Sequence, residues 1–365
     1  MAGVSGLQGE GRVAVRPGTV EPTAPRALRS VRGCRQHAVS GIPFLRVYLQ
    51  SFGLSRITQD KILSGAWRQG TVKVYTSVLK KWGLFCLEKK VKPLQPSIAQ
   101  VVAFLSALEN DGAGYAGINA ARCALSLILP RVDGATIGKH DIVRWFIRSV
   151  YERRPPQPRY SRFWDVKVVF DLFKSWPKNS LLSLKDLSMK LAVLLLLVTG
   201  QRGQVIVALN IEHMDLSRTE AIFDLDKLTK SNRLGDPLST VGLDAFPECD
   251  KLCVLRTLKA YLRATVELRS STQLLVSFVR PHAAISRDTL ARWTLAVLKK
   301  AGVDTDRYGS HSTRGALVSS ARKLGVSVKA LLNHAGWKSE VSFARHYHKR
   351  VEDAESVAQT VLRRH

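Results

Sequence analysis

Long apolar runs are absent from this sequence of 365 residues. The longest, LAVLLLLV at Leu191–Val198, is far shorter than the roughly 20 residues that a membrane-spanning helix requires. The N-terminus also lacks the hydrophobic core of a secretion signal. We therefore expect neither a membrane protein nor a secreted one, and we interpret the run as a buried helix.

Cysteine is scarce too, with residues only at positions 34, 86, 123, 249 and 253. Cys249 and Cys253 are close in sequence, but no second pair completes a tetrahedral zinc site. Free thiols in a reducing compartment are the simplest explanation. The sequence contains no GxxxxGK[ST] phosphate loop, no HExxH zinc motif and no acidic cluster suited to a two-metal nuclease. We expect no metal and no cofactor.

Acidic side chains are few, since 29 Asp and Glu residues face 56 Lys and Arg residues for a net charge of +27. With 45% hydrophobic residues, the chain can still build real cores. A basic excess on a foldable chain favours a polyanionic partner, with nucleic acid first and an acidic membrane surface second. A merely basic protein is the alternative.

The first half of the chain divides into three segments. Residues 1–40 are rich in Gly, Pro and Arg without periodicity, which predicts a disordered basic arm. Residues 56–151 predict a compact basic bundle of about four helices, in which an apolar stripe runs from Thr71 to Phe85 and Ser97 caps the next helix. ERRPPQPRYS at 152–161 contains three prolines and predicts an extended linker, taken as 152–162. The lysines of the bundle either face phosphates or only solvate its surface.

The second half predicts a larger, mostly helical domain at 163–350. One stretch, AIFDLDKLTKSNRLGDPLSTV at 221–241, has strand-like flanks around turn residues and predicts a β-hairpin. Residues 351–365 form a C-terminal tail with apolar residues at near-helical spacing, which packs either on its own domain or on a neighbouring copy.

Four short stretches of this domain contain candidate catalytic residues. VTGQRGQ at 198–204 places Arg202 after the buried apolar run, and LDKLTKSNRLG at 225–235 places Lys230 at the hairpin tip. GSHSTRGALVSSARKLG at 309–325 holds His311 and Arg314, which share one face if a helix begins near Ser310. HAGWKSEVSFARHYHKR at 334–350 completes the set with Trp337 and Tyr347, although each of these residues taken alone has an ordinary structural explanation.

In this order, two arginines, a hairpin lysine, a His-x-x-Arg and a tyrosine after a Gly-Trp resemble the tyrosine recombinase family. The resemblance covers most of 163–350, and the helices of 56–151 stand where that family has its core-binding domain. TGQRGQ, HSTRGA and HAGWKSEVSFARHYHK are similar to the recombinases of DIRS- and Ngaro-type retroelements. The implied fold is mainly α, with a helical, SAM-like core-binding domain followed by a mixed α+β catalytic domain that contains a small hairpin or sheet.

The resemblance also implies roles. Arg202 and Arg314 would hold the DNA phosphate, because planar guanidinium groups donate paired hydrogen bonds to its oxygens. Tyr347 would be the nucleophile that forms a covalent 3′-phosphotyrosyl link, and Lys230 would protonate the departing 5′ oxygen. His311 would assist proton transfer, and Trp337 would donate its indole N–H or support the site. The family's scheme uses double-stranded DNA, a tetramer assembled on it, no metal and no ATP.

Departures from the family pattern leave some roles open. Many relatives carry an acid three residues after the first arginine, where this chain has Val205, preceded by Gln204. Trp337 and Tyr347 are ten residues apart, one more than in many relatives. His334 and His348 either contact the phosphate or lie on the surface. If Tyr347 is not the nucleophile, the upstream residues Tyr261 and Tyr308 are the next tyrosines to test.

The sequence therefore predicts a recombinase or integrase of a mobile element, located in the nucleus if the chain is eukaryotic and otherwise in the cytoplasm or nucleoid. Two alternatives stay open. One is a DNA-binding protein that kept the fold and lost the activity, and the other is an enzyme similar to type IB topoisomerases, which share the chemistry but relax DNA without exchanging partners.

Overall fold

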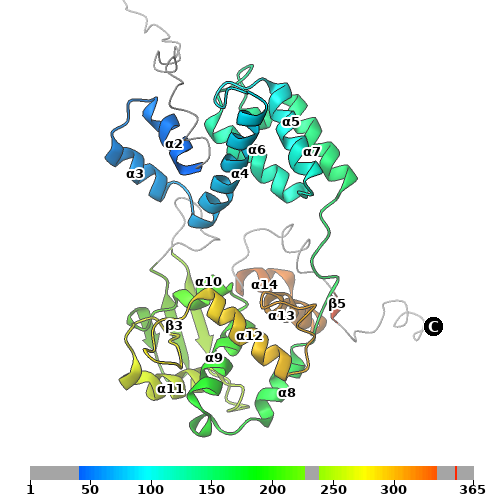
Figure 1. Ribbon diagram of the computed structural model, residues 1–365. Helices are drawn as coiled ribbons and strands as arrows, with labels where there is room; N and C mark the ends of the chain where they lie inside the picture. The colour runs from blue at the N-terminus through cyan, green and yellow to red at the C-terminus, as the bar shows by residue number, and fades with distance from the viewer. Residues whose placement is uncertain (1–40, 227–237, 335–349, 352–365) are drawn as a thin grey trace, which may run out of the picture. The chain divides into compact units, whose positions relative to one another are not determined.

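The computed structural model describes residues 41–226, 238–334 and 350–351, and the chain divides into two compact units, Met1–Gln157 and Pro158–His365 (Figure 1). The predicted disordered arm, residues 1–40, and all of the predicted tail except Val351 lie outside the described residues. The division between the units falls inside the stretch 152–162, where three prolines interrupt the helical pattern.

The N-terminal unit is a helical bundle. Each long helix buries one apolar face, and Trp82 lies at the centre, where its ring packs edge-on against Phe104 at a centroid distance of 5.1 Å. Ser97 begins its helix as expected, because its hydroxyl accepts the backbone N–H of Gln100 while the Gln100 side chain accepts the N–H of Ser97. The described helices are α2 (Gly41–Gln50), α3 (Arg56–Gly65), α4 (Gln69–Glu88), α5 (Ile98–Asn110), α6 (Tyr115–Ile128), the short 3-10 turn η3 (Ile137–Lys139) and α7 (Asp141–Arg153).

The helices of this unit agree with the expected positions in α4 to α7 and differ at the start. Helix α2 precedes the predicted bundle and packs against α4, with Leu45 buried, so the described bundle has more helices than the predicted four. At the other end, α7 continues through Glu152 to Arg153, since the Arg153 guanidinium bonds both carboxylate oxygens of Glu109 on α5 at 2.8 and 2.9 Å.

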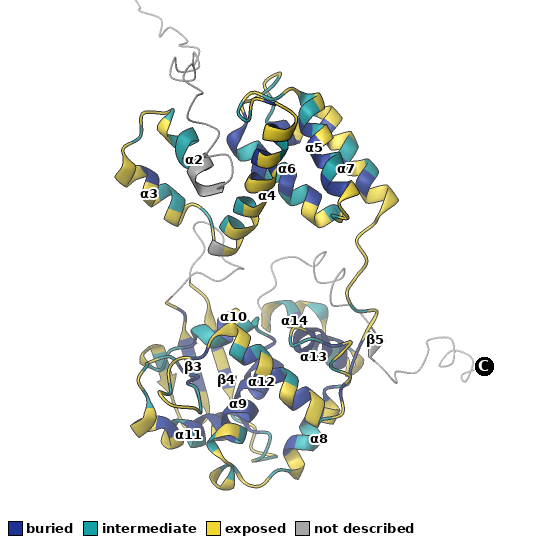
Figure 2. Cartoon of the chain, in the orientation of Figure 1, coloured by how far each residue is buried: buried dark blue, intermediate teal, exposed yellow. Residues whose placement is uncertain are grey.

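The C-terminal unit is built around α9, whose apolar run is buried from Leu191 to Leu197 and partly buried at Val198, as the dark blue of this helix in Figure 2 shows. The interpretation of Leu191–Val198 as a buried helix is therefore confirmed. Helices α10, α11, α12 and α13 contact α9 or its neighbours and enclose it. The described helices are α8 (Lys167–Ser175), η4 (Asn179–Leu181), α9 (Leu184–Thr199), α10 (Gly203–Ala208), η5 (Ile211–His213), α11 (Val254–Thr265), η6 (Val266–Leu268), α12 (Arg287–Lys300), α13 (Ser312–Lys323) and α14 (Val328–His334).

A three-stranded antiparallel sheet lies beside these helices in the order β2 (Met214–Leu216), β3 (Glu220–Asp224) and β4 (Thr240–Asp244). Strands β3 and β4 pair from Glu220 opposite Asp244 to Asp224 opposite Thr240, which confirms the predicted hairpin. Ala221, Phe223, Val241 and Leu243 alternate inward toward the core. Two further short strands, β1 (Arg162–Phe163) and β5 (Arg350–Val351), pair in parallel.

This architecture confirms the expected fold class, a mainly α protein with a small β-hairpin sheet. Within the described residues, no helix is both long and apolar enough to span a membrane.

Candidate active site

A sharp turn after the buried helix α9 positions Arg202. Helix α9 ends at Gly200, whose φ of 60° lies in the left-handed region that glycine adopts without strain. The chain then turns, and Arg202 becomes the N-cap residue of α10. The backbone carbonyl of Arg202 accepts the N–H of Val205 at 2.8 Å, which fixes the start of α10. Arg202 thus stands at the start of α10, three residues after the end of the buried helix α9.

The N-terminus of α13 positions His311 and Arg314. The helix begins at Ser312, with His311 as N-cap residue, so His311 and Arg314 are three residues apart on one side of the first turn. The predicted start near Ser310 is two residues early, while the predicted shared face is present. Arg314 is only 4% exposed, whereas His311 is exposed.

A cavity of about 430 Å³ brings these residues together. Arg202, His311 and Arg314, three of the six predicted catalytic residues, line it together with residues of α12. They come from segments more than 100 positions apart, joined because α10, α12 and α13 all pack around α9. The other three, Lys230, Trp337 and Tyr347, lie outside the described residues, as does His348.

The cavity is strongly cationic. Arg287, in the first turn of α12, adds a third guanidinium to those of Arg202 and Arg314. Among the described lining residues, Asp288 is the one carboxylate. The cavity also lies at the N-terminal end of α13, where the backbone N–H groups of the first turn carry partial positive charge. Charge and geometry together suit an anion with several oxygens, such as a phosphodiester.

Arg287 and Asp288 are pocket residues that the sequence reasoning missed. A local signal was available, because Ser286 caps α12 by accepting the backbone N–H of Thr289 at 3.1 Å. That signal places a helix start at this point of the sequence. It does not show that the start faces Arg202, since this depends on the packing of α12 against α9 and α10.

The position where many relatives of the resembled family carry an acid is occupied here by a buried apolar side chain. Val205 is 4% exposed and belongs to the hydrophobic core. Gln204, by contrast, is exposed and lines the cavity. Asp288 is a second polar residue in reach of the same cavity.

The two alternative tyrosines are part of the core. The Tyr261 hydroxyl donates to the carbonyl of Val276 at 3.2 Å and accepts its N–H at 3.0 Å, and burial raises the pKa of this phenol. The Tyr308 hydroxyl donates to the carbonyl of Arg162 at 3.2 Å, and its side chain is buried as well. Neither residue lines the cavity, so neither is placed to attack a bound phosphate.

His334 is held away from the cavity lining. Its Nε2 lies 2.6 Å from the carbonyl oxygen of Val198, and because a carbonyl only accepts, Nε2 carries the proton. The contact ties the end of α14 to the last turn of α9.

One buried lysine of the C-terminal unit, Lys190, lies outside the cavity lining and has a shifted pKa. Lys190 on α9 is buried, and its ammonium donates to Oδ1 of Asn179 at 2.8 Å and lies over the ring of Phe173. Burial, helped by the charge of Lys251, lowers the pKa of Lys190 to about 8. Lys190 does not line the cationic cavity, so we assign it to the fold.

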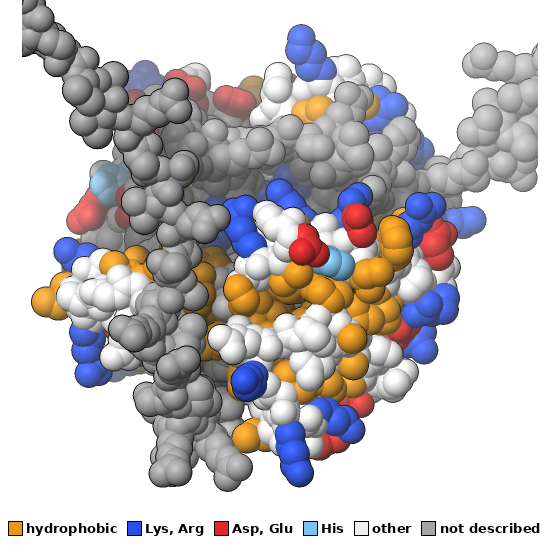
Figure 3. All heavy atoms as spheres, turned by 90° about the horizontal axis from the view of Figure 1, so that it is seen from above, with side chains coloured by type: hydrophobic (Ala, Val, Ile, Leu, Met, Phe, Trp, Pro, Cys, Tyr) orange, Lys and Arg blue, Asp and Glu red, His pale blue; other side chains and the backbone are white. Residues whose placement is uncertain are grey.

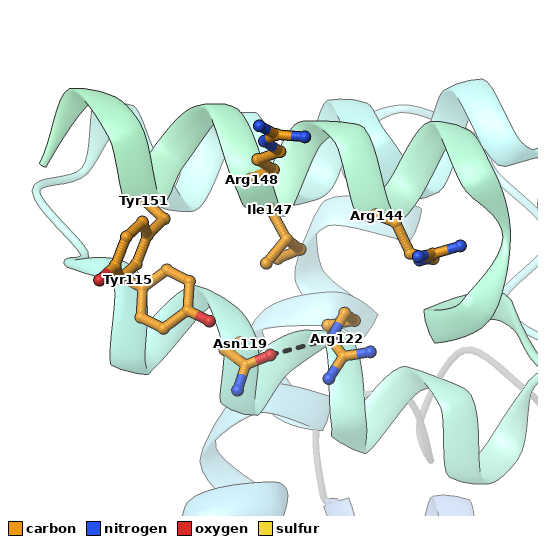
Figure 4. Close-up of a pocket in the computed structure, with 7 residues that line it drawn as sticks. All are labelled: Tyr115, Asn119, Arg122, Arg144, Ile147, Arg148 and Tyr151. Carbon is orange, nitrogen blue, oxygen red and sulfur yellow. Dashed lines mark hydrogen bonds between the residues drawn. The ribbon is translucent and has the colours of Figure 1, made fainter. Parts of the chain in front are cut away.

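A second basic concavity, of about 380 Å³, lies in the N-terminal unit between α6 and α7 (Figure 4). Arg122 from α6 and Arg144 and Arg148 from α7 line it, beside an edge-to-face pair of Tyr115 and Tyr151 with ring centroids 5.1 Å apart. We call these five side chains the α6–α7 groove.

Arg122 is fixed in this groove, whereas the other two arginines reach into solvent. Its Nε donates to Asn119 and its Nη1 to the carbonyl of Gly138 at 2.7 Å. Arg144 and Arg148 are mostly exposed, and each pairs with an exposed acid on its own helix. On the face seen in Figure 3, basic side chains lie mainly toward the margin around an apolar centre.

Among the described residues, no group of three or more His, Cys, Asp or Glu side chains is arranged to hold a metal ion. The cysteines that the structure describes, Cys86, Cys123, Cys249 and Cys253, have free thiols. Cys253 caps α11, because its sulfur accepts the N–H of Arg256 at 3.5 Å.

The fold is similar to that of known DNA recombinases. No protein-family model and no curated protein matches the sequence. Among solved structures, the XerH site-specific recombinase bound to a palindromic difH substrate gives a TM-score of 0.55 at 14% identity, covering 90% of this chain and 87% of that one. The Tn1549 transposon integrase in complex with transposon right-end DNA gives a TM-score of 0.54 at 11% identity, covering 88% and 98%. These neighbours are tyrosine recombinases and integrases, and the chain has their fold.

Proposed function

We propose that this protein cleaves and rejoins DNA strands through a covalent 3′-phosphotyrosyl intermediate and thereby carries out site-specific recombination. The observation that carries the proposal is the convergence of Arg202, His311 and Arg314 in one cationic cavity. The fold supports it, because the structural neighbours XerH and the Tn1549 integrase are a recombinase and an integrase that were solved on DNA.

In the proposed reaction, the two guanidinium groups hold the non-bridging oxygens of the scissile phosphate. Negative charge builds on these oxygens as the phosphate is attacked, and preorganised donors stabilise that charge in the transition state. His311, at the N-cap of α13 beside Arg314, donates to the same phosphate or moves a proton. Trp337 supports the phosphate through its indole N–H.

The Tyr347 oxygen attacks phosphorus, the bond from phosphorus to the 5′ oxygen breaks, and Lys230 gives that oxygen a proton. The phenolic proton leaves to solvent or to His311. One phosphate ester replaces another, so the bond energy is kept and a free 5′ hydroxyl can reverse the step on a second strand. The scheme needs neither ATP nor a metal ion, because guanidinium groups neutralise the developing charge.

The proposed role of Tyr347 is supported by the part of the chain that follows it. It resumes three residues later, in β5, which pairs with β1 and contacts α13, the helix that carries Arg314. Three residues of chain span at most about 11 Å, since consecutive Cα atoms are about 3.8 Å apart. This short connection to a strand that contacts α13 supports the proposed role of Tyr347.

The proposed type of mobile element is supported by the sequence motifs. TGQRGQ, HSTRGA and HAGWKSEVSFARHYHK favour a recombinase of the DIRS or Ngaro retroelement type. Exchange between two duplexes requires four active sites, so the active form is a tetramer assembled on double-stranded DNA. A chain from a eukaryote would work in the nucleus.

One observation favours a second function. Val205 replaces an acid of the family and is buried in the core, so a DNA-binding protein that no longer cleaves is the alternative. The cavity would then bind a backbone phosphate without chemistry.

The test uses nicked duplexes in which cleavage releases a short fragment and so cannot be reversed. The duplexes are taken from the termini of the mobile element that encodes the chain. They are incubated with the full chain in EDTA and without nucleotide, and we expect a protein–DNA complex that survives denaturation. Joined products from two duplexes then identify a recombinase, whereas relaxation of supercoiled plasmid without joining identifies a topoisomerase. Binding without any covalent complex would overturn the proposal in favour of the silent DNA-binding protein.

A further inference from the structure

The six residues Arg159–Trp164, where the linker stretch enters the C-terminal unit, are bonded to the segment that carries His311 and Arg314. We call them the linker-exit segment. The Tyr160 hydroxyl accepts the backbone N–H of Gly309 at 3.2 Å. The indole N–H of Trp164 donates to the hydroxyl of Ser312 at 2.9 Å. Gly309 precedes His311 by two residues, and Ser312 follows it directly as the first residue of α13. The two hydrogen bonds therefore hold the chain on both sides of His311.

Ring packing makes the same connection more rigid. The Tyr160 ring lies 5.5 Å from the rings of both Tyr308 and Phe163. The Phe163 ring covers Gly315 so closely that a Cβ built at this glycine would be 2.1 Å from the ring. The first turn of α13 can therefore approach the linker-exit segment only because position 315 has no side chain.

The linker-exit segment also holds the strand that follows the predicted nucleophile. In the parallel pair β1–β5, Arg162 is opposite Arg350 and Phe163 is opposite Val351. The segment thus contacts the chain next to His311, next to Arg314 and three residues after Tyr347.

The Trp164–Ser312 bond is suited to fix an orientation. Trp164 is buried, and Ser312 has no exposed surface. A hydrogen bond away from water is strong, and leaving one partner unsatisfied there is costly. This hydrogen bond thus links the position of Trp164 to the start of α13.

We propose that Tyr160 and Trp164 are positioning residues that hold His311 and Arg314 in register with the phosphate and couple them to the interdomain linker. The inference rests on the proposed function, since it concerns the regulation of that same site. When the N-terminal unit binds duplex DNA, the linker end becomes fixed, and the turn from Gly309 to Arg314 becomes fixed with it. Cleavage is then fastest when both units hold the same duplex.

The first arm of the test is a double-mutant cycle in the full chain. Trp164→Phe keeps a ring but removes the N–H, and Ser312→Ala removes its acceptor. We expect each to slow covalent complex formation at saturating DNA by about 10- to 100-fold, the loss typical of a misplaced catalytic group, while the DNA Kd stays unchanged. The double variant should be no slower than either single one, because both remove the same bond. Thr265→Ala, which removes a buried hydroxyl that donates to the carbonyls of Tyr261 and Leu262 in its own helix α11, is the matched control and should cleave normally.

The second arm measures hydrogen exchange and does not depend on cleavage. DNA binding to the wild-type chain should slow exchange in 159–164 and in 309–316 together. In Trp164→Phe, or in Tyr160→Phe if the first variant fails to fold, DNA should protect 159–164 but not 309–316. The inference is overturned if Trp164→Phe and Tyr160→Phe both cleave at the wild-type rate and both show the wild-type protection of 309–316. If the wild-type chain forms no covalent complex at all, the proposed function fails, and the exchange comparison still decides whether the linker positions α13.

Discussion

Arg314 has an unfavourable position for a residue that only supports the fold. A guanidinium group stays charged in proteins, and Arg314 is 4% exposed in the first turn of α13, where the helix dipole opposes a cation. Arg202 stands at the start of another helix, α10. An anion in the cavity would be attracted by both guanidinium groups and by the N-terminal end of α13. These charges are the reason to interpret the cavity as a phosphate site.

Lys230→Ala should slow cleavage and leave DNA affinity nearly unchanged, because the proposed role of Lys230 is to protonate the leaving 5′ oxygen. A substrate with sulfur at that bridging position needs no proton to leave, so it should restore the rate of the variant. Single-turnover cleavage of the two substrates gives the measurement. If the sulfur substrate brings no recovery, another residue supplies the proton, and His311 is the next candidate.

Lys190 should shape the pH dependence of stability. Its pKa is about 8 in the folded chain and near 10.5 when unfolded, so between these values the unfolded state binds more protons and stability rises with pH. Below about pH 8 both states are protonated, and this gain is absent. In Lys190→Met the rise should disappear, so that the difference in unfolding free energy between wild type and variant changes only above about pH 8. Denaturant unfolding from pH 7 to 10.5 tests this, and a constant difference would show that Lys190 titrates normally.

Among the secondary-structure elements, β1 and α13 pack closely, because the Phe163 ring lies directly over Gly315. Gly315→Ala should destabilise the C-terminal unit strongly, because the added Cβ would overlap the Phe163 ring. Gly117→Ala in α6 is the matched control, since a Cβ there meets only Ala113 at 3.8 Å, an ordinary contact. In that variant the better helix propensity of alanine should leave stability unchanged or raise it by up to about 1 kcal/mol. Thermal unfolding compares the two, and equal effects would contradict the packing of Phe163 on α13.

The sequence predicts well those elements that bury one face. Helices α4 to α7 show regular apolar spacing, and the hairpin β3–β4 shows alternating inward residues, so both follow from local pattern. Helix α2 was missed because its ten residues follow directly on a segment without periodicity. The two-residue strands β1 and β5 are too short for any pattern, and their pairing joins residues 188 positions apart in the chain (350 minus 162).

The candidate site was also predictable only in part, because some of its residues come together through packing between distant segments of the chain. Arg202, His311 and Arg314 were found through motifs, and the structure brings all three to one cavity. Arg287 and Asp288 belong to no motif and reach the cavity through the packing of α12 on α9 and α10. Long-range packing of this kind leaves no local trace in a sequence.

In the whole molecule, two units joined by a proline-containing linker share the basic excess of the chain, and we propose that both bind the same DNA duplex. Neutralised phosphates release counterions, so affinity for duplex DNA should fall steeply as salt is raised. An affinity that stays flat from low to high salt would contradict this proposal.

The arginines of the α6–α7 groove allow the salt dependence of DNA binding to be tested at individual residues. Replacing both Arg144 and Arg148 by Gln should reduce the slope of log affinity against log salt by about 1.8, roughly 0.9 for each phosphate that is no longer neutralised. Arg122 is left in place because its hydrogen bonds support the fold. Arg256→Gln, on α11 and outside both basic cavities, is the control and should leave the slope unchanged.

The central claim is that Tyr347 attacks a phosphate held by Arg202 and Arg314. Its most direct test is to digest the covalent complex trapped on nicked DNA and to identify the modified residue by mass spectrometry, in parallel with Tyr347→Phe and Tyr308→Phe chains. We expect a nucleotide on Tyr347, no complex with Tyr347→Phe despite normal DNA binding, and a retained complex with Tyr308→Phe. A covalent complex that persists in Tyr347→Phe, or a nucleotide attached to any other residue, would contradict it.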